Sequence, residues 1–415
     1  MKRRFYPAYR VHSIIFILFI IIGFSVSSPA ELYNGAKAII FNSDILITDY
    51  VELAGLGPTL VNSGLISLMI VFMYMLSGIK PNGSTIMSFW LIAGFSFFGK
   101  NIFNIWPIIG GVWLYSKYRK EPFINYILIS VLGTTLAPTV SQLAFQGIFP
   151  QGISVIIGVS VGVLIGFILP PLAASTVNIH HGYNLYNLGF SGGLLAMVLM
   201  SVYRMIGIDF EKRFLWSTGN NLFFSILLFL LFTFFIIYGF IKNNNSFKNV
   251  LNIFGHTGKL ISDYYLLYEN AAYINMGILG IFSTAYILLI GGDLNGPTIS
   301  GILTIVGFGA FGKHIYNVLP IMLGASLTVF LHLWDINSPS MLLAILFSTA
   351  LAPIAGQFGW PIGMLTGFLH VAVVMNTGYV HGGMNLYNNG FAAGFVALIL
   401  VPIISAFKKG DTSEK

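Results

Sequence analysis

The residues of this chain that could bind or move a solute occur in pairs, one in each half of the sequence. Lys100 and Lys313 each follow a Phe-Gly pair inside an otherwise apolar segment. A lysine in such a segment can attract an anion or pair with a carboxylate, here Asp49 or Asp263, but it can equally extend its ammonium group to the lipid headgroups. The sequence leaves both interpretations of the two lysines open.

The most specific motif is Asn-Leu-Tyr-Asn followed by several glycines, and it also occurs twice. Its amides and hydroxyl can bind a polar solute, or they can form interhelical hydrogen bonds while the glycines allow close packing. His180 and His381 precede the two copies, and an imidazole beside a glycine turn is more often a loop or capping residue than a proton carrier. The polar residues of the motif are Asn184, Tyr186, Asn187, Asn385, Tyr387 and Asn388.

Four further amide side chains form two matched pairs. Gln142 and Gln357 each follow a Leu-Ala-Pro sequence, and a proline inside an apolar helix leaves a backbone carbonyl free to bind a solute. Asn104 and Asn317 follow the two lysines at equal spacing. We predict that the substrate-binding residues are the two lysines, these four amides, the two histidines and the six motif residues.

The elements that position these residues are membrane-spanning helices, because the composition excludes a soluble fold. Of the 415 residues, 56% are hydrophobic and only 8% are charged, whereas roughly a quarter of a soluble domain is charged. Apolar stretches at 11–28, 60–76, 222–241 and 388–404 approach or reach the roughly 20 residues that a helix needs to cross a bilayer. The first could pass for a signal peptide, but nothing downstream resembles a secreted domain. We predict an all-α, polytopic membrane protein with an uncleaved first span.

Several kinds of chemistry are excluded or disfavoured by what the sequence lacks. Without cysteine, disulfides, thiolate nucleophiles and sulfur-ligated metals are excluded. Neither metal-ligand spacing of histidines nor a Walker-type glycine loop occurs, so we predict no metal, no cofactor and no direct use of ATP. The 13 acidic residues lie in or near presumed loops, with Glu52 and Glu269 nearest to membrane depth, which argues against a buried carboxylate relay. We predict no catalytic residues and no enzymatic activity.

The two halves of the chain are copies of one another. The segment that begins Asn82-Gly83 recurs as one that begins Asn295-Gly296, and the identities continue in register through the lysines and prolines. Apolar composition alone would not produce so many identities. We predict an N-terminal helix and loop (1–46), a first repeat (47–207), a linker with one span (208–260), a second repeat (261–406) and a tail (407–415).

The positions of lysine and arginine predict that the second repeat is inverted relative to the first. Cytoplasmic loops are enriched in these residues. By alternation, both termini and the loops at Lys80 and Lys117 lie on the cytoplasmic side of the cell (inner) membrane. Lys212 and Arg213 are an exception, because this scheme places them outside. The net charge of +7 mostly reflects this orientation, and no basic stripe interleaved with aromatics indicates nucleic-acid binding.

Each repeat also contains an apolar helix that is too short to cross the membrane. The segment 85–98 has about 14 residues, which make about 21 Å of helix, and a Gly-Lys sequence then interrupts it before a second short run. The same arrangement recurs around Gly312. A re-entrant pair of half-helices would explain both copies, and paired interruptions in two halves point to a transport site.

The duplicated Phe-Gly-Lys and Asn-Leu-Tyr-Asn-x-Gly-Phe motifs resemble those of an uncharacterised family of bacterial multi-pass membrane proteins, over nearly the whole chain. That family has no assigned activity. Two stretches, 82–111 and 186–196, distantly resemble urea transporters. This second resemblance implies inverted repeats around a narrow pore lined by amide and hydroxyl oxygens, suited to a small neutral solute. The lysines at the breaks and the segments around Pro138 and Pro353 depart from it and argue against urea itself.

Together these patterns predict a transporter or channel for a small polar solute, either neutral and amide-like or a small anion. The path would lie at the interface of the repeats, and membrane lipids would surround the protein. Membrane facilitators of this kind often assemble as homo-oligomers. One alternative is an intramembrane enzyme acting on a lipid-linked substrate, which would need His180 and His381 to face one cavity. The other is a membrane scaffold whose asparagines only pack.

Overall fold

The computed structural model describes residues 6–260 and 262–412 of the protein. In these two ranges the chain forms α-helices and short 3-10 helices and contains no β-strand, which confirms the predicted all-α class. Nine helices in the described ranges are long and apolar enough to cross a membrane. On one of them, Leu222, Ile226 and Leu230 are spaced four residues apart and are largely exposed, as expected of a face turned to lipid.

The helices follow the same order in the two halves. The first half contains α1 (Pro7–Val26), α2 (Pro29–Ile40), α3 (Tyr50–Ala54), α4 (Leu56–Leu76), α5 (Gly83–Phe95), α6 (Ile105–Tyr118), α7 (Ile127–Gly133), α8 (Ala137–Phe145), α9 (Gln151–Ile179) and α10 (Asn187–Met205). The second contains α11 (Asn221–Lys242), α12 (Lys248–Phe254), α13 (Tyr264–Tyr268), α14 (Ala271–Leu289), α15 (Gly296–Phe308), α16 (Ile315–Ser326), α17 (Pro339–Ser348), α18 (Ala352–Phe358), α19 (Trp360–Val374) and α20 (Asn388–Thr412).

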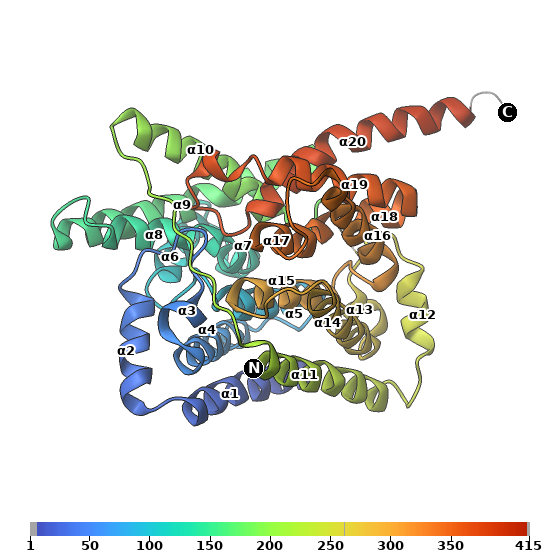
Figure 1. Ribbon diagram of the computed structural model, residues 1–415, viewed down its shortest axis with the longest axis horizontal. Coiled ribbons are helices and arrows are strands. Elements are labelled where there is room, and N and C mark those ends of the chain that lie inside the picture. The colour runs from blue at the N-terminus through green and yellow to red at the C-terminus, as the bar shows by residue number, and fades with distance from the viewer. Residues whose placement is uncertain (1–5, 261, 413–415) are drawn as a thin grey trace.

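Helices α1 and α11 are equivalent to each other, although the predicted repeats begin only at residues 47 and 261. Gly64 of α4 lies so close to α1 that a Cβ there would be 2.6 Å from the Phe16 carbonyl oxygen, and Gly277 of α14 stands in the same relation to the Phe232 carbonyl of α11. In Figure 1, α1 and α11 run from the middle of the lower edge to opposite sides, where α2 and α12 rise. The likeness of the halves therefore covers these helices too.

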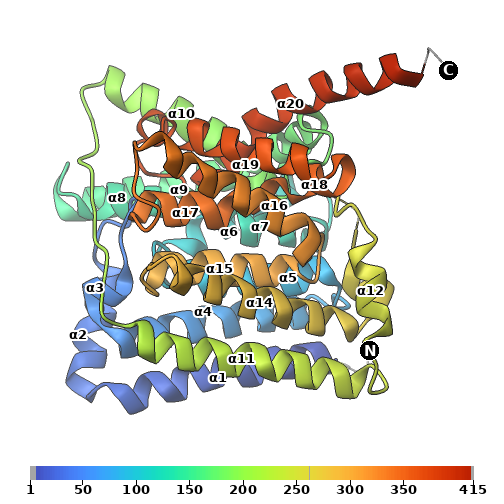
Figure 2. The same ribbon diagram turned by 45° about the vertical axis from the view of Figure 1, so that its right-hand side comes forward.

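The predicted helix breaks are confirmed. Helices α5 and α15 have 13 residues each and begin with capping boxes formed by Asn82 and Asn295. After them the chain turns through Gly99 and Gly312, whose φ angles of 88° and 103° favour glycine. The two half-helices lie side by side in the middle of the molecule (Figure 2).

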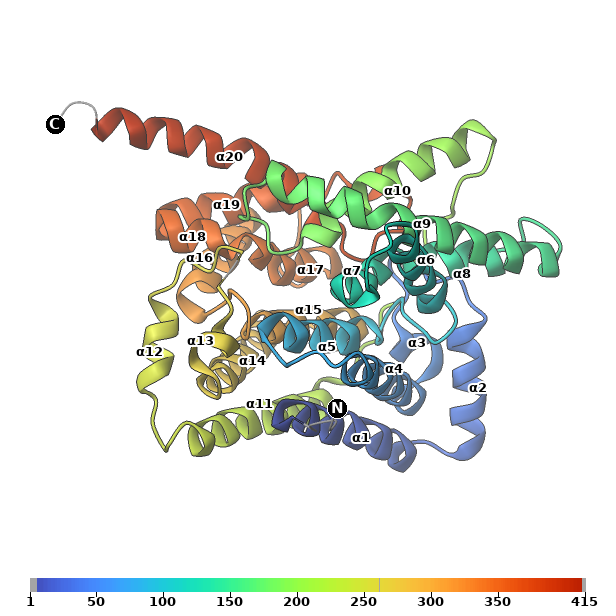
Figure 3. The same cartoon turned by 180° about the vertical axis from the view of Figure 1, so that it is seen from behind.

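A second pair of breaks lies before the two prolines. A 3-10 turn at Thr134–Leu136 separates α7 from α8, and another at Thr349–Leu351 separates α17 from α18. Pro138 and Pro353 thus occupy the first turn of a new helix, where a missing N–H is tolerated. Above these elements, α10 and α20 cross one another (Figure 3).

Candidate functional site

Each of the two matched helix breaks brings a lysine of one half into contact with a tyrosine of the other half. The Lys100 ammonium donates to the Tyr387 hydroxyl at 2.6 Å and lies 4.7 Å from the centre of that ring. The Lys313 ammonium donates to the Tyr186 hydroxyl, and also to Thr349 Oγ1 at 2.7 Å. Both lysines are fully buried in protein. The halves are therefore joined by two crossed Lys–Tyr pairs, and neither ammonium extends to the surface.

Phenylalanine rings complete the surroundings of the two ammonium groups. Phe95 lies 5.3 Å from Lys100 Nζ and Phe308 lies 4.9 Å from Lys313 Nζ, measured to the ring centres. Within the described ranges, neither lysine has a carboxylate within ion-pair distance. Among the described residues, the two amino groups thus meet hydroxyl oxygens and aromatic faces, which stabilise a cation less than a carboxylate does.

The pairing of the lysines with Asp49 or Asp263, considered from the sequence, is wrong. Asp263 accepts from the backbone N–H of Gly83 at 2.8 and 2.9 Å, and Asp49 accepts from that of Gly296 at 3.2 Å. Each carboxylate therefore caps the N-terminus of the short helix in the other half, where a negative charge is favourable. Asp49 is held further by the backbone and hydroxyl of Ser217, at 2.9 and 2.7 Å.

A cavity of about 160 Å³ lies between the tyrosines of the two Lys–Tyr pairs. Both tyrosines line it, together with Phe95, Phe308 and residues of α7 and of the start of α10. Thr304 also lines it, and the buried hydroxyl of Thr304 has no hydrogen-bond partner among the described residues. The cavity is mainly apolar, and its polar lining residues are two tyrosines, one threonine and two asparagines, namely Tyr186, Asn187, Thr304, Tyr387 and Asn389.

The first asparagine of each motif holds the tyrosine and the opposite half. Asn184 Oδ1 accepts from the Tyr186 N–H at 2.9 Å, and its amide donates to the Gly390 carbonyl at 2.9 Å. Asn385 does the same for Tyr387 at 3.1 Å and for Gly189 at 3.0 Å. These contacts match the interhelical-packing interpretation and also fix the position of the two hydroxyls.

The second asparagine of each motif binds the histidine of its own half. Asn187 Oδ1 lies 2.9 Å from His180 Nε2, and Asn388 Oδ1 lies 2.6 Å from His381 Nε2. Both histidines lie at the end of a helix, as the capping interpretation expects. Neither touches a lysine, so the histidines do not belong to the Lys–Tyr pairs.

Asn104 and Asn317 shape the turns at the breaks. Their amides donate to the carbonyls of Gly99 and Gly312, at 3.0 and 2.9 Å. Gln142 is fully buried and contacts Ser43 and Gln146.

Gln357, the predicted counterpart of Gln142, is exposed at the end of α18. The structure therefore does not place the two glutamines in equivalent surroundings.

Two further asparagines, Asn62 and Asn275, belong to the breaks and were missed in the sequence. The Asn62 amide donates to the Lys100 carbonyl at 3.0 Å and the Asn275 amide to the Lys313 carbonyl at 2.8 Å. Each amide also donates to the backbone carbonyl of the residue that caps the C-terminus of the preceding short helix, α5 or α15. The two asparagines have the same spacing as the two lysines, and this spacing was the signal that could have identified them.

The expectation that no carboxylate is buried also needs correction. Asp44 is fully buried and accepts from the Tyr50 hydroxyl at 2.8 Å, Asn101 at 2.8 Å and Asn104 at 3.0 Å. Asp49 is fully buried as well, whereas Glu52 and Glu269 are exposed.

The equivalent of Asp44 in the second half is Gly258, where a Cβ would lie only 2.0 Å from the Gly312 carbonyl oxygen. The buried carboxylate is therefore a property of the first half alone.

Comparison with known proteins identifies one family. The family model described as "Protein of unknown function (DUF1576)" matches the chain twice, over residues 28–205 and over residues 242–406. The two matches repeat the duplication seen in the helix order, and they begin upstream of residues 47 and 261. No curated protein and no solved structure matches the chain. The likeness to urea transporters thus stays an expectation from the sequence.

Proposed function

The chain belongs to this family of unknown function, and from that premise we propose that it moves a small polar solute across a membrane, along the interface between its two halves. The observation that carries the proposal is the crossed pairing of Lys100 with Tyr387 and of Lys313 with Tyr186. These pairs lie at matched helix breaks, and their tyrosines line one cavity. Matched breaks in two halves are the usual site of solute binding in transporters built from repeats.

The chemistry of the pairs supports a polar solute. Burying an ammonium group without a carboxylate costs several kcal/mol, and a neutral hydroxyl oxygen offsets only part of that cost. A solute that presents an oxygen can take the place of the tyrosine hydroxyl at the lysine, and the displaced hydroxyl can then donate to the solute. Aromatic and aliphatic walls around these points would exclude bulk water.

The arrangement of the halves supports the predicted inverted topology. Equivalent helices α1 and α11 run in opposite directions in Figure 1, and the first half contains five of the long apolar helices, an odd number. We place both termini on the cytoplasmic side of the cell (inner) membrane. A solute would then reach the same site from one side of the membrane along the first half and from the other side along the second half.

A transport measurement with purified protein tests the proposal. We expect proteoliposomes to take up urea, acetamide or a small anion such as acetate faster than empty vesicles. Lys100→Met and Lys313→Met, which keep an unbranched side chain one atom shorter than lysine but remove the amino group, should slow uptake about tenfold or more, since each removes a hydrogen-bond donor. Ser201→Ala is the matched control, because Ser201 is exposed and bonds only within α10. Uptake equal to that of empty vesicles for every solute would refute transport.

We also propose that the protein is not an enzyme. The intramembrane-enzyme alternative needs His180 and His381 in one cavity, yet each is bound to an asparagine of its own half. His381 lines the larger cavity described below, and His180 lines neither cavity. These contacts favour transport over catalysis.

A further inference from the structure

A second and larger cavity, of about 640 Å³, lies beside the first and is rich in basic side chains. Arg204, Lys212 and Arg213 line it, and Asp209 is the one carboxylate among its lining residues. Phe347 and Asn389 line both cavities, so the two are neighbours. The charged residues that line this cavity therefore give an excess of two positive charges, and its other titratable residues are Tyr379 and His381.

The segment that carries Lys212 and Arg213 is fixed in place. It joins α10 to α11 and pairs with the segment before α3, since the Ile47 N–H donates to the Arg213 carbonyl at 2.8 Å and the Leu215 N–H donates to the Ile47 carbonyl at 3.0 Å. Figure 1 shows it descending along the molecule from α10 to α11. The backbone pairing holds these two cations at the cavity instead of leaving them on a loose loop.

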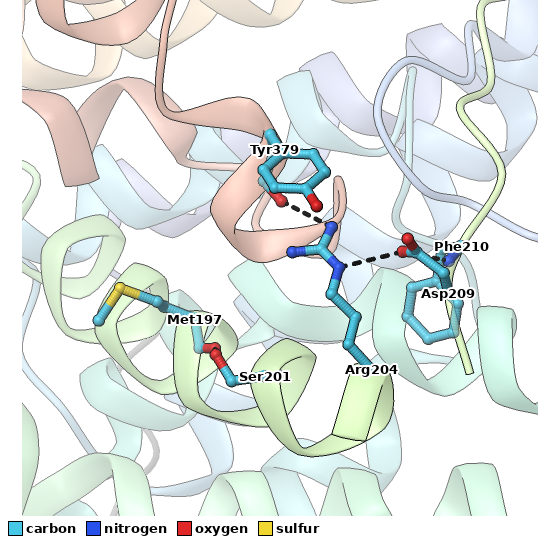
Figure 4. A network of polar contacts seen from close by, with 6 residues as sticks. All are labelled: Met197, Ser201, Arg204, Asp209, Phe210 and Tyr379. Carbon is cyan, nitrogen blue, oxygen red and sulfur yellow. Dashed lines mark hydrogen bonds and ion pairs between the residues drawn. The ribbon is translucent and has the colours of Figure 1, made fainter. Parts of the chain in front are cut away.

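Arg204 is already neutralised by its neighbours. Its Nε lies 3.3 Å from Asp209 Oδ1, its Nη2 donates to the Tyr379 carbonyl at 2.9 Å, and its guanidinium stacks 4.0 Å from the centre of the Tyr379 ring (Figure 4). This network spans the two halves, since Arg204 belongs to α10 and Tyr379 precedes α20. Arg204 and Asp209 thus form one wall of the cavity with little net charge.

Lys212 and Arg213 are the lining cations that have no carboxylate within ion-pair distance among the described residues, although Arg213 also interacts electrostatically with the buried carboxylate of Asp44. The Arg213 guanidinium donates through Nη1 to Asn42 Oδ1 at 2.5 Å and to the Ser43 carbonyl at 3.0 Å, both neutral acceptors. Lys212 makes no hydrogen bond or ion pair with any residue that the structure describes. These two residues also broke the charge pattern of the sequence, because the predicted topology places them on the outer side. A ligand of opposite charge accounts for both observations.

We propose that this cavity binds a small oxyanion, a carboxylate or a phosphate, through Lys212 and Arg213, and that it delivers the anion to the neighbouring cavity between the Lys–Tyr pairs. The proposal rests on the proposed transport function and names the solute class as anionic. Arg213 offers a planar donor group that matches oxyanions, and Lys212 adds a mobile point charge. A cavity lined by one sign of charge also concentrates such ligands and speeds their capture.

Equilibrium dialysis of the purified protein in detergent tests this site without any transport step. Radiolabelled inorganic phosphate and radiolabelled acetate serve as the two probes, at constant ionic strength set with sodium chloride. We expect saturable binding of at least one probe, at one site per chain. Lys212→Gln and Arg213→Gln should each weaken it about tenfold, the equivalent of about 1.4 kcal/mol, whereas Lys212→Arg should keep it.

The matched control removes the same charge elsewhere. Lys117→Gln alters the last turn of α6 and Arg119→Gln alters the residue that caps it; neither residue lines the cavity, and binding should be unchanged. Because Arg213 also holds residues 42 and 43, its variant can fail to fold. Lys212→Glu then decides alone, since Lys212 is exposed and has no such structural contact.

The outcomes separate this proposal from the transport proposal. If neither probe binds, or if Lys212→Gln and Lys212→Glu bind as tightly as the natural protein, the oxyanion site is refuted, even if urea or acetamide still crosses proteoliposomes. If the probes bind and the variants weaken binding, the site stands, even if no solute is transported.

Discussion

At the scale of single residues, the two Lys–Tyr pairs are similar but not identical. Lys313 donates to Tyr186 and also to Thr349 of its own half. The equivalent of Thr349 is Thr134, which donates to the Val131 carbonyl at 2.6 Å and, among the described residues, has no hydrogen bond with Lys100. Among the described residues, Tyr387 is therefore the only hydrogen-bond acceptor of Lys100, and the two pairs should respond differently when their hydroxyls are removed.

This difference yields a stability prediction. Tyr387→Phe removes the acceptor of Lys100 and should lower the free energy of unfolding by about 1–3 kcal/mol, the usual cost of a buried polar group left unpaired. Tyr186→Phe should cost less, because Thr349 still accepts from Lys313. Thermal unfolding in detergent measures both. Equal losses of stability, or a greater loss for Tyr186→Phe, would contradict this account of the pairs.

At the scale of elements, close helix packing adds to the polar contacts between the halves. A Cβ at Gly193 of α10 would lie 2.3 Å from the Phe391 ring, and one at Gly394 of α20 would lie 2.2 Å from the Phe190 ring. The crossing of α10 and α20 thus depends on glycine at two equivalent positions. Because these helices begin at the motif asparagines, their spacing also sets where the tyrosine hydroxyls lie.

A pair of alanine substitutions tests this crossing. Gly193→Ala should destabilise the protein by about 1–3 kcal/mol, since the added methyl group overpacks the contact with Phe391. Gly110→Ala is the matched control, because Gly110 is also helical and a Cβ there would meet nothing within 4 Å. The control should be neutral or slightly stabilising, since alanine favours helix over glycine. Thermal unfolding of both variants is the measurement, and a neutral Gly193→Ala would show that the two helices have room to separate.

The helix breaks could be predicted from the sequence because their causes are local. A glycine at positive φ and a proline at the first turn of a helix act on their own neighbourhood, so Gly99 and Pro138 mark the breaks directly. The partners of the lysines could not be predicted in this way. Lys100 and Tyr387 are 287 residues apart, and the repeat pattern alone gives no preference between a tyrosine of the same half and one of the other half.

Exposure was the other property that the sequence could not give. Gln142 and Gln357 follow the same Leu-Ala-Pro sequence, yet α8 is buried to Ala144 whereas α18 becomes exposed after Ala355. Asp44 lies in a connection between short helices, where acidic residues are normally solvated, and only the tertiary fold encloses it. These differences in side-chain exposure depend on which residues pack against each element, and those residues differ between the two halves.

At the scale of the whole molecule, the two halves share a framework but differ in charge. Asp44 is replaced by Gly258, and the segment with Lys212 and Arg213 follows α10 without a described counterpart after α20. Inverted halves alone would present the same surfaces to both sides of the membrane. These differences would make the protein unequal toward the two sides of the membrane, with a basic cavity on one side. The orientation of the halves therefore decides from which side a solute reaches each cavity.

The orientation can be measured with single cysteines, since the natural chain has none. Arg119 and Asp335 lie in the exposed loops that follow the equivalent helices α6 and α16. If the halves are inverted, Arg119→Cys lies in the cytoplasm and Asp335→Cys lies outside. A membrane-impermeant maleimide added to intact cells should then label Asp335→Cys alone, and lysis should expose Arg119→Cys. Neither change disturbs the fold, because surface ion pairs such as that of Arg119 with Glu121 contribute little. Labelling of both cysteines, or of neither, in intact cells would place the two loops on one side and exclude inverted halves.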